Sequence, residues 1–268
     1  MVQYHIFRPG KVNSPAAEAA AMSLRRLVKC ESDSSYARMM AFRLGGGAAA
    51  ECEDVYFIAT DGGRCVSRLW FGWGKHAGAV GNFGNFRTAN ELQGQGIGGR
   101  LFTMLAEALC LESKPPLALF CTSDKPHLVR LYGKIGFRPA LADTASGPLY
   151  CPLADSPESF AEFRRWYYRP ALRLHLRPGT VGRRHEIDCL LNFALRDEGE
   201  DTEARPGGFS SFEAAFLAVT ENPSLGKLEV LTTEDERTVG WAFTPSGGER
   251  EMLFHPGFRE LPILRDRA

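Results

Sequence analysis

The chain has 268 residues, with 32 Lys and Arg against 32 Asp and Glu, and 44% of its residues are apolar. These values are typical of globular proteins and exclude a disordered, collagen-like or coiled-coil chain. A net charge of zero also excludes a strongly basic nucleic-acid-binding protein, so we expect no nucleic-acid partner. The charge is unevenly spread, because residues 1–154 hold 17 basic and 12 acidic residues and residues 155–268 hold 15 and 20. We therefore expect two domains, 1–154 and 155–268.

The sequence shows no targeting or membrane signal. Residues 1–5 contain no basic segment leading into an apolar run, which argues against a signal peptide. The apolar stretches are far shorter than the roughly 20 residues that span a bilayer. The seven cysteines are scattered and form no CxxC pair, so we expect no metal site, no disulfide framework and a cytoplasmic location. Cys110 and Cys121 lie in apolar segments and are expected to be small core residues.

The first half of the chain alternates between strand and helix patterns. Ser14-Pro15 is a helix start, Asp61-Gly62-Gly63 is a hairpin turn, and Gly136 is a helix end. The predicted order is β-α-β-β-β-α-β-α with a final extended stretch, over residues 4–8, 14–29, 55–59, 64–73, 79–88, 100–111, 117–121, 126–136 and 149–150.

The second half begins with a similar pattern after a linker at 154–157. Arg8-Pro9-Gly10 recurs as Arg177-Pro178-Gly179, 169 positions later, and each tripeptide precedes a predicted helix. A second hairpin and a further strand follow at nearly the same offset, and an aromatic helix precedes them, over residues 160–168, 183–196, 227–244 and 252–255. We interpret this pattern as an incomplete duplication, the alternative being two unrelated starts that share a tripeptide by chance.

The segment Gln93–Arg100 contains four glycines directly before a well-patterned helix. Glycines allow successive backbone N–H groups to point into one concavity, and the helix adds the positive end of its dipole. The segment therefore predicts a phosphate or pyrophosphate site, with a flexible turn as the simpler alternative.

Two ligands compete for this site. Gly94-x-Gly96-x-x-Gly99 satisfies the dinucleotide fingerprint, with Asp124 as the ribose-binding acid. Against that reading, polar residues separate the preceding strand from the first glycine, and the turn follows the third sheet strand instead of the first.

Gln93-x-x-Gly96-x-Gly98 also resembles the pyrophosphate motif of the GNAT superfamily of acetyl-CoA-dependent N-acetyltransferases. Leu131-Tyr132-Gly133-Lys134-Ile135-Gly136-Phe137 resembles its second signature, 38 positions further on with one helix and one strand between. The resemblance implies an α/β fold of the α+β type, a mixed sheet with splayed central strands, complete over 1–154 and followed by a partial copy. It implies transfer of an acetyl group from acetyl-CoA to a primary amine by direct attack in a ternary complex.

The resemblance also implies site residues. The backbone of Phe86, Arg87 and Thr88 would hold the pantetheine arm. Ser123 would approach the CoA sulfur, and Lys125 would meet a phosphate in place of the usual Asn. The pyrophosphate would lie on Gln93, Gly94, Gln95, Gly96, Ile97, Gly98, Gly99 and Arg100.

Tyr132 aligns with the tyrosine that protonates the departing thiolate. The base is open, because residues 79–88 hold no carboxylate. Glu91 is the nearest in sequence, and His76 or a water chain are alternatives. Trp70, Phe71 and Trp73 are either pocket residues for the acceptor or core residues, and residues 142–147 would border the acceptor.

The second domain has no glycine-rich segment, so we expect it to bind no acetyl-CoA and to shape the acceptor cleft of a monomer or homodimer. The departure at Leu128 from the usual alanine and the missing strand carboxylate favour an alternative function, a catalytically silent acyl-CoA-binding or regulatory module.

Overall fold

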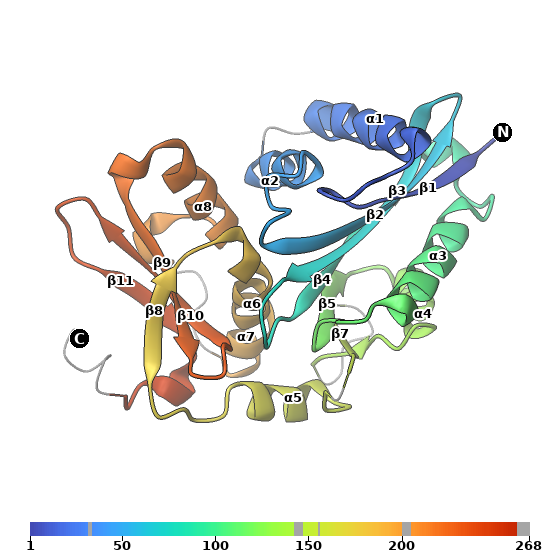
Figure 1. Ribbon diagram of the computed structural model, residues 1–268. Coiled ribbons are helices and arrows are strands. Elements are labelled where there is room, and N and C mark those ends of the chain that lie inside the picture. Colours follow the sequence, from blue (N-terminus) through green and yellow to red (C-terminus); the bar gives the residue numbers. More distant parts are fainter. Residues whose placement is uncertain (32–33, 142–146, 155, 200–204, 262–268) are drawn as a thin grey trace. The chain divides into compact units, whose positions relative to one another are not determined.

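The computed structural model describes residues 1–31, 34–141, 147–154, 156–199 and 205–261 (Figure 1). The chain divides into two compact units. The first contains Met1–Trp73 and Asn82–Pro115, and the second contains Gly74–Gly81 and Pro116–Ala268.

The first unit is built on four strands in the order β1-β2-β3-β4. They are β1 (Gln3–Phe7), β2 (Cys52–Asp61), β3 (Arg64–Gly74) and β4 (Gly81–Thr88). β1 and β2 are antiparallel, with Phe7 opposite Tyr56. β2 and β3 form the predicted hairpin, in which Gly62 and Gly63 both have positive φ, as a tight two-residue turn requires.

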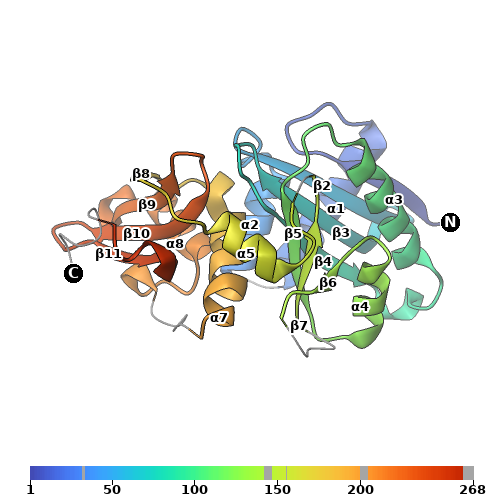
Figure 2. The ribbon, with the colours of Figure 1, turned by 90° about the horizontal axis from the view of Figure 1, so that it is seen from below.

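Three helices cover this sheet: α1 (Pro15–Glu31), α2 (Ser35–Leu44) and α3 (Ile97–Leu111). α1 begins as predicted, because the Ser14 hydroxyl accepts a hydrogen bond from the Ala17 N–H at 3.2 Å. Figures 1 and 2 show α1 and α2 on one face of the strands and α3 on the other.

The strands alternate between these two faces. Tyr56 and Ile58 of β2 share a buried cluster with Leu24 of α1. On the opposite face, the rings of Phe83 in β4 and Phe102 in α3 meet edge to face at 6.2 Å. Both faces of the sheet are therefore covered, and the residues of β2 and β3 are buried almost without a break.

The second unit begins with β5 (Ala118–Ser123), α4 (Pro126–Gly133), β6 (Arg138–Pro139) and β7 (Gly147–Pro152). β5 and β7 are antiparallel, from Ala118 opposite Pro152 to Ser123 opposite Gly147. β6 pairs with the other edge of β7.

A second sheet of this unit has the order β11-β10-β9-β8. Its strands are β8 (Leu174–Pro178), β9 (Gly226–Thr233), β10 (Thr238–Pro245) and β11 (Glu251–Phe254). The helices around it are α5 (Phe160–Tyr167), α6 (Arg184–Cys189), α7 (Leu195–Asp197) and α8 (Phe212–Glu221). A π-helical turn, Leu190–Ala194, joins α6 to α7, so the helix predicted at 183–196 is one run with a π insertion.

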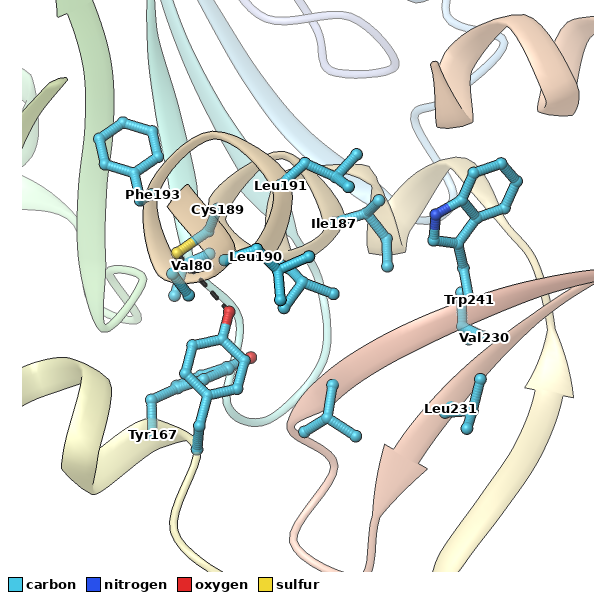
Figure 3. Packing of buried hydrophobic residues seen from close by; sticks show 14 of the residues in the cluster. Val80, Tyr167, Ile187, Cys189, Leu190, Leu191, Phe193, Val230, Leu231 and Trp241 are labelled. Carbon is cyan, nitrogen blue, oxygen red and sulfur yellow. Dashed lines mark hydrogen bonds between the residues drawn. The ribbon is translucent and has the colours of Figure 1, made fainter. Parts of the chain in front are cut away.

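This π turn lies in the main apolar core of the second unit. Figure 3 shows Ile187, Leu190 and Phe193 of the helix in one buried cluster with Val230 and Trp241 of the second sheet. The helix and the sheet thus share one hydrophobic core.

Several predicted details are wrong. α4 ends at Gly133 and not at Gly136, which instead has φ 101° in the turn that follows. Cys110 is exposed, although Cys121 is buried as expected. α2, α8 and β6 have no counterpart among the predicted elements.

All seven cysteines are free. Within the described ranges, no helix is long and apolar enough to cross a membrane.

Candidate functional site

Asn85 lies inside β4 and has a left-handed backbone with φ 53°. Such a conformation is uncommon for a residue other than glycine, and inside a strand it disturbs the hydrogen-bond ladder as a β-bulge does. The Asn85 amide holds the bend, because its Oδ1 accepts from Arg68 Nε at 2.8 Å and its Nδ2 lies 3.8 Å from Met40 Sδ. The bend directly precedes residues 86–88, whose backbone is expected to hold the pantetheine arm.

The glycine-rich turn forms the start of α3. Gly94 and Gly96 have φ of 79° and 77°, and Gly96 is the N-cap of the helix without any side-chain cap. A Cβ atom built on Gly94, Gly96 or Gly99 would meet no atom within 4 Å, so the turn faces open space. The first N–H groups of a helix have no intrahelical partner, which leaves those of α3 available to an anion.

Gly98 is needed for a different reason. A Cβ atom there would lie 2.9 Å from Cζ of Phe86, whose ring also stacks on Phe102 at 6.4 Å. The absence of a side chain at Gly98 therefore lets α3 pack closely against the end of β4. Ile97 is buried and anchors the first turn, whereas Arg100 is exposed beside it.

The side chains of Gln93 and Gln95 form hydrogen bonds with the residues that precede the turn. Gln93 Nε2 donates to the Thr88 carbonyl at 3.2 Å and to Asn90 Oδ1 at 3.0 Å. Gln95 Nε2 donates to the Glu91 carbonyl at 3.4 Å. The Gln93 and Gln95 side chains are thus engaged with Thr88, Asn90 and Glu91, and they position the turn between β4 and α3.

The remaining predicted cofactor residues lie in the second unit, at the end of β5 and the start of α4. Ser123 is buried, and its hydroxyl accepts a hydrogen bond from the Lys125 N–H at 3.3 Å. Lys125 is exposed at the N-cap position of α4.

Tyr132 is buried on α4, with its ring 6.1 Å from that of Phe137. Burial raises the pKa of the Tyr132 phenol above its usual value, and the nearby Cys121 thiol adds to this shift. The phenol is therefore protonated throughout the neutral range, which suits a proton donor and excludes Tyr132 as a base.

The two side chains considered as a base have different surroundings. Glu91 lies on a 3₁₀ turn, Asn90–Leu92, and forms an ion pair with Arg64 at 3.4 Å in which both side chains are mostly exposed. His76 belongs to the second unit, where Nε2 lies 3.4 Å from Oε1 of the fully buried Glu186. Burial lowers the pKa of His76, but interactions with the Glu186 carboxylate outweigh it and the pKa is raised, so less of His76 is in the neutral form that a base requires.

The aromatic cluster of β3 is core. Trp70, Phe71 and Trp73 are each at most 5% exposed, and the Phe71 and Trp73 rings stack at 5.5 Å. Residues 142–146 of the predicted acceptor loop lie outside the described residues. Among the residues that the structure places, no group of three or more His, Cys, Asp or Glu side chains is arranged to hold a metal ion.

The structure is that of an α/β protein with a glycine-rich turn at the N-terminus of α3, placed after the fourth strand. A dinucleotide fingerprint follows the first strand of its sheet, so the topology does not favour that reading. Residues 53–146 match the family model described as acetyltransferase (GNAT) domain. The chain therefore carries a GNAT acetyltransferase domain over residues 53–146.

No curated protein matches the chain. Solved structures with similar folds include Escherichia coli ElaA, at 16% identity over 56% of this chain and 99% of that one with a TM-score of 0.39. The GNAT family N-acetyltransferase YhbS from Escherichia coli, in complex with CoA, has 18% identity over 57% and 84% with a TM-score of 0.38. An acyl-CoA N-acyltransferase from Pseudomonas aeruginosa has 16% identity over 56% and 99% with a TM-score of 0.36.

Proposed function

We propose that the protein transfers an acetyl group from acetyl-CoA to a primary amine of a small molecule or peptide. The observation that carries this proposal is the turn at Gly94 and Gly96, which leads into α3 after β4 and the 3₁₀ turn Asn90–Leu92. Its open face and free helix N–H groups fit a pyrophosphate, and the exposed Arg100 adds a positive charge in the first turn of the helix. Acetyl-CoA is the co-substrate of the family.

The reaction follows from a direct attack in a ternary complex. The amine nitrogen forms a bond to the acetyl carbonyl carbon, and a backbone N–H of residues 86–88 stabilises the oxyanion that develops. The C–S bond then breaks, and the CoA thiolate takes a proton from the Tyr132 phenol. The proton lost by the amine passes to Glu91, directly or through water.

The buried state of Tyr132 supports its role, because its raised pKa keeps the proton on the phenol until a thiolate forms. Gln93 and Gln95 would act as positioning residues, since their side chains hold the turn by hydrogen bonds to the backbone. Ser123 and Lys125 keep their proposed roles toward the CoA sulfur and a phosphate on the basis of their sequence positions.

A second candidate function is a catalytically silent acyl-CoA-binding module. It is favoured by one observation, the exposed position and ion pair of Glu91, the carboxylate nearest in sequence to β4. Release of free thiol from acetyl-CoA over a panel of primary amines separates the two. Thiol release that depends on an amine supports the enzyme, and acetyl-CoA binding without turnover for every amine supports the silent module.

We also propose that the second sheet is a partial repeat of the first unit. In the first unit, β1 pairs antiparallel with β2 across two helices, and Phe7 lies opposite Tyr56. In the second, β8 pairs antiparallel with β9 across the helices α6 to α8, and Pro178 lies opposite Glu229. These partners are offset by 171 and 173 positions, close to the spacing of the Arg-Pro-Gly tripeptides.

The repeat has no counterpart of the glycine-rich turn in the described residues that follow β11, so this part of the chain is proposed to bind no acetyl-CoA. A fragment of residues 1–154 tests the domain boundary at 154. A soluble fragment with full activity would contradict a role of residues 155–268 in shaping the acceptor cleft.

A further inference from the structure

The first unit contains a cavity of about 670 Å³, and of its described lining only Arg87 and Glu91 also belong to the proposed acetyltransferase site. It lies between the C-terminal half of α1, the β2–β3 hairpin and the segment that follows β4, and the lining residues that the structure describes belong to the first unit. Its volume is within the range of about 300–1,000 Å³ that is usual for small-molecule sites.

The described lining is strongly cationic. It includes four arginines, Arg26, Arg64, Arg68 and Arg87, against a single carboxylate, Glu91. These arginines come from three elements, α1, β3 and β4, and α1 is distant in sequence from the two strands, so the fold brings them together. Guanidinium groups present paired N–H donors that match the oxygens of phosphate and carboxylate groups.

The arginines are held differently. Arg68 is only 6% exposed, and its Nε donates to Asn85 Oδ1, so the bulge of β4 positions a buried cation in the wall of the cavity. Arg64 and Glu91 pair across the exposed rim at 3.4 Å, where an ion pair is worth little. Arg26 projects from α1 and has no hydrogen-bond or ion-pair partner within the portion of the chain that is described.

We infer that this cavity binds a small oxyanion ligand, one that carries phosphate or carboxylate groups with two or more negative charges. The excess of cations raises the local concentration of anions, and the guanidinium groups of the buried Arg68 and the exposed Arg26 supply N–H donors. Ser23, which also lines the cavity, adds a polar group on the same face of α1 as Arg26 and Leu27.

This site is distinct from the proposed pyrophosphate turn. None of the described lining residues belongs to 93–100. α1 also covers the opposite face of the sheet from α3, whose N-terminus carries the turn (Figures 1 and 2). Bound CoA would contact the cavity only at Arg87, through its backbone, so it is expected to leave the side formed by α1 and β3 open.

Binding of inorganic phosphate and of citrate to the full chain tests the inference. Isothermal titration is carried out at constant ionic strength set with chloride, because screening weakens exposed charges, and with or without saturating CoA. We expect at least one of the two anions to bind when CoA is present. Arg26→Gln is expected to weaken that binding about tenfold, which corresponds to about 1.4 kcal/mol.

Arg25→Gln is the matched control, because Arg25 is the adjacent exposed arginine on α1 and does not line the cavity. It should change the affinity less than twofold. Arg68→Gln is a second variant from a buried wall position, and its folded state is checked by circular dichroism before titration.

Three results would overturn the inference: neither anion binds, both arginine variants weaken binding equally, or binding disappears when CoA is added. The last result would place the anion on the glycine-rich turn. The comparison of anion binding by Arg26→Gln and Arg25→Gln does not depend on CoA. It therefore tests the anion site even if CoA does not bind and the acetyltransferase proposal fails. A preference for phosphate over citrate identifies the ligand class further.

Discussion

Arg43 and Asp54 form a two-point ion pair inside the first unit, with Nε 3.1 Å from Oδ2 and Nη2 2.5 Å from Oδ1. The two side chains are 1% and 2% exposed. Trp70 completes the arrangement, because its indole N–H donates to Asp54 Oδ1 at 2.8 Å and its ring lies 4.7 Å from Arg43 Cζ. The pair therefore attaches α2 to the sheet of the first unit. Gly72 leaves room for it, since a Cβ atom there would lie 2.5 Å from Asp54 Oδ1.

Asp54→Asn should strongly destabilise the protein. The change keeps the shape of the side chain but leaves the buried Arg43 guanidinium without its countercharge, which costs about 3–5 kcal/mol of the free energy of unfolding. Urea denaturation followed by circular dichroism measures this loss. Asp61→Asn removes an exposed ion pair with the N-terminal amine and should cost less than about 1 kcal/mol. Equal losses in the two variants would contradict the structural role of the buried pair.

Gly96→Ala should weaken acetyl-CoA binding about tenfold. Its φ of 77° strains any L side chain by about 1–2 kcal/mol, so the turn is expected to shift and misdirect the N–H groups at the start of α3. Affinity is measured by titration with acetyl-CoA. Gly247→Ala is the control, because Gly247 has φ 75° and equally open surroundings in the turn before β11. A similar loss of affinity in both variants would mean that general destabilisation, and not the turn, is responsible.

Tyr132→Phe should lower the turnover number 100-fold or more, in line with the contribution of about 10²–10⁴ from a general acid, and leave acetyl-CoA affinity nearly unchanged. The measurement is thiol release at saturating acetyl-CoA. Because burial raises the Tyr132 pKa above 10, the acid form persists on the alkaline side, and the wild-type rate should not fall between pH 8 and 10 through loss of this proton.

Tyr150→Phe serves as the control for that variant. Tyr150 is also buried in the second unit, and its hydroxyl donates to the Pro157 carbonyl at 2.5 Å, which is a structural contact. Its removal should change stability and not the turnover number of the folded enzyme. If Tyr132→Phe behaves in the same way, the proton-donor assignment fails.

The elements that the sequence predicts well are those with local signals. The β2–β3 hairpin has its glycine turn, and α1 has its Ser14 cap and Pro15 start. The two missed long helices each bury a charge whose partner is on another element. Arg43 of α2 needs Asp54 of β2, and Glu213 of α8 needs Arg184 of α6. Charged residues are expected to face solvent, so Arg43 and Glu213 interrupt the apolar spacing by which the buried faces of α2 and α8 would be recognised.

The same distinction applies to the candidate site. The glycine-rich turn could be predicted because the positive φ angles at Gly94 and Gly96 require glycine, and the two glycines stand close together in the sequence. The left-handed backbone of Asn85 could not be predicted, because it depends on contacts of the Asn85 side chain with Arg68 and Met40 on other elements. The cationic cavity likewise exists only after α1, β3 and β4 have come together. The aromatic residues of β3 allowed two readings, and burial selects the core.

His255 should make the protein less stable in mild acid. Burial and, to a smaller degree, the charge of Arg164 lower the pKa of His255 to about 4. Its Nδ1 accepts a hydrogen bond from the Gly257 N–H at 3.2 Å, and its ring stacks on Tyr168 at 4.2 Å, both of which suit the neutral imidazole. Glu198 Oε1 lies 3.5 Å from Nε2, but the same oxygen is also paired with Arg164 at 3.4 Å, so it favours the charged imidazole only weakly.

The unfolded chain binds a proton at His255 below pH 6.5, whereas the folded chain resists protonation down to about pH 4. His255 therefore does not change the free energy of unfolding above pH 6.5. As the pH falls from 6.5 toward about 4, the free energy of unfolding decreases by about 1.4 kcal/mol per pH unit. Between pH 7 and 5 the native protein should lose about 2 kcal/mol of unfolding free energy through His255. His255→Gln removes that loss from the urea denaturation profile, and His175→Gln, at an exposed position of β8, should retain it. An unchanged pH dependence in His255→Gln would show that other groups control the acid sensitivity.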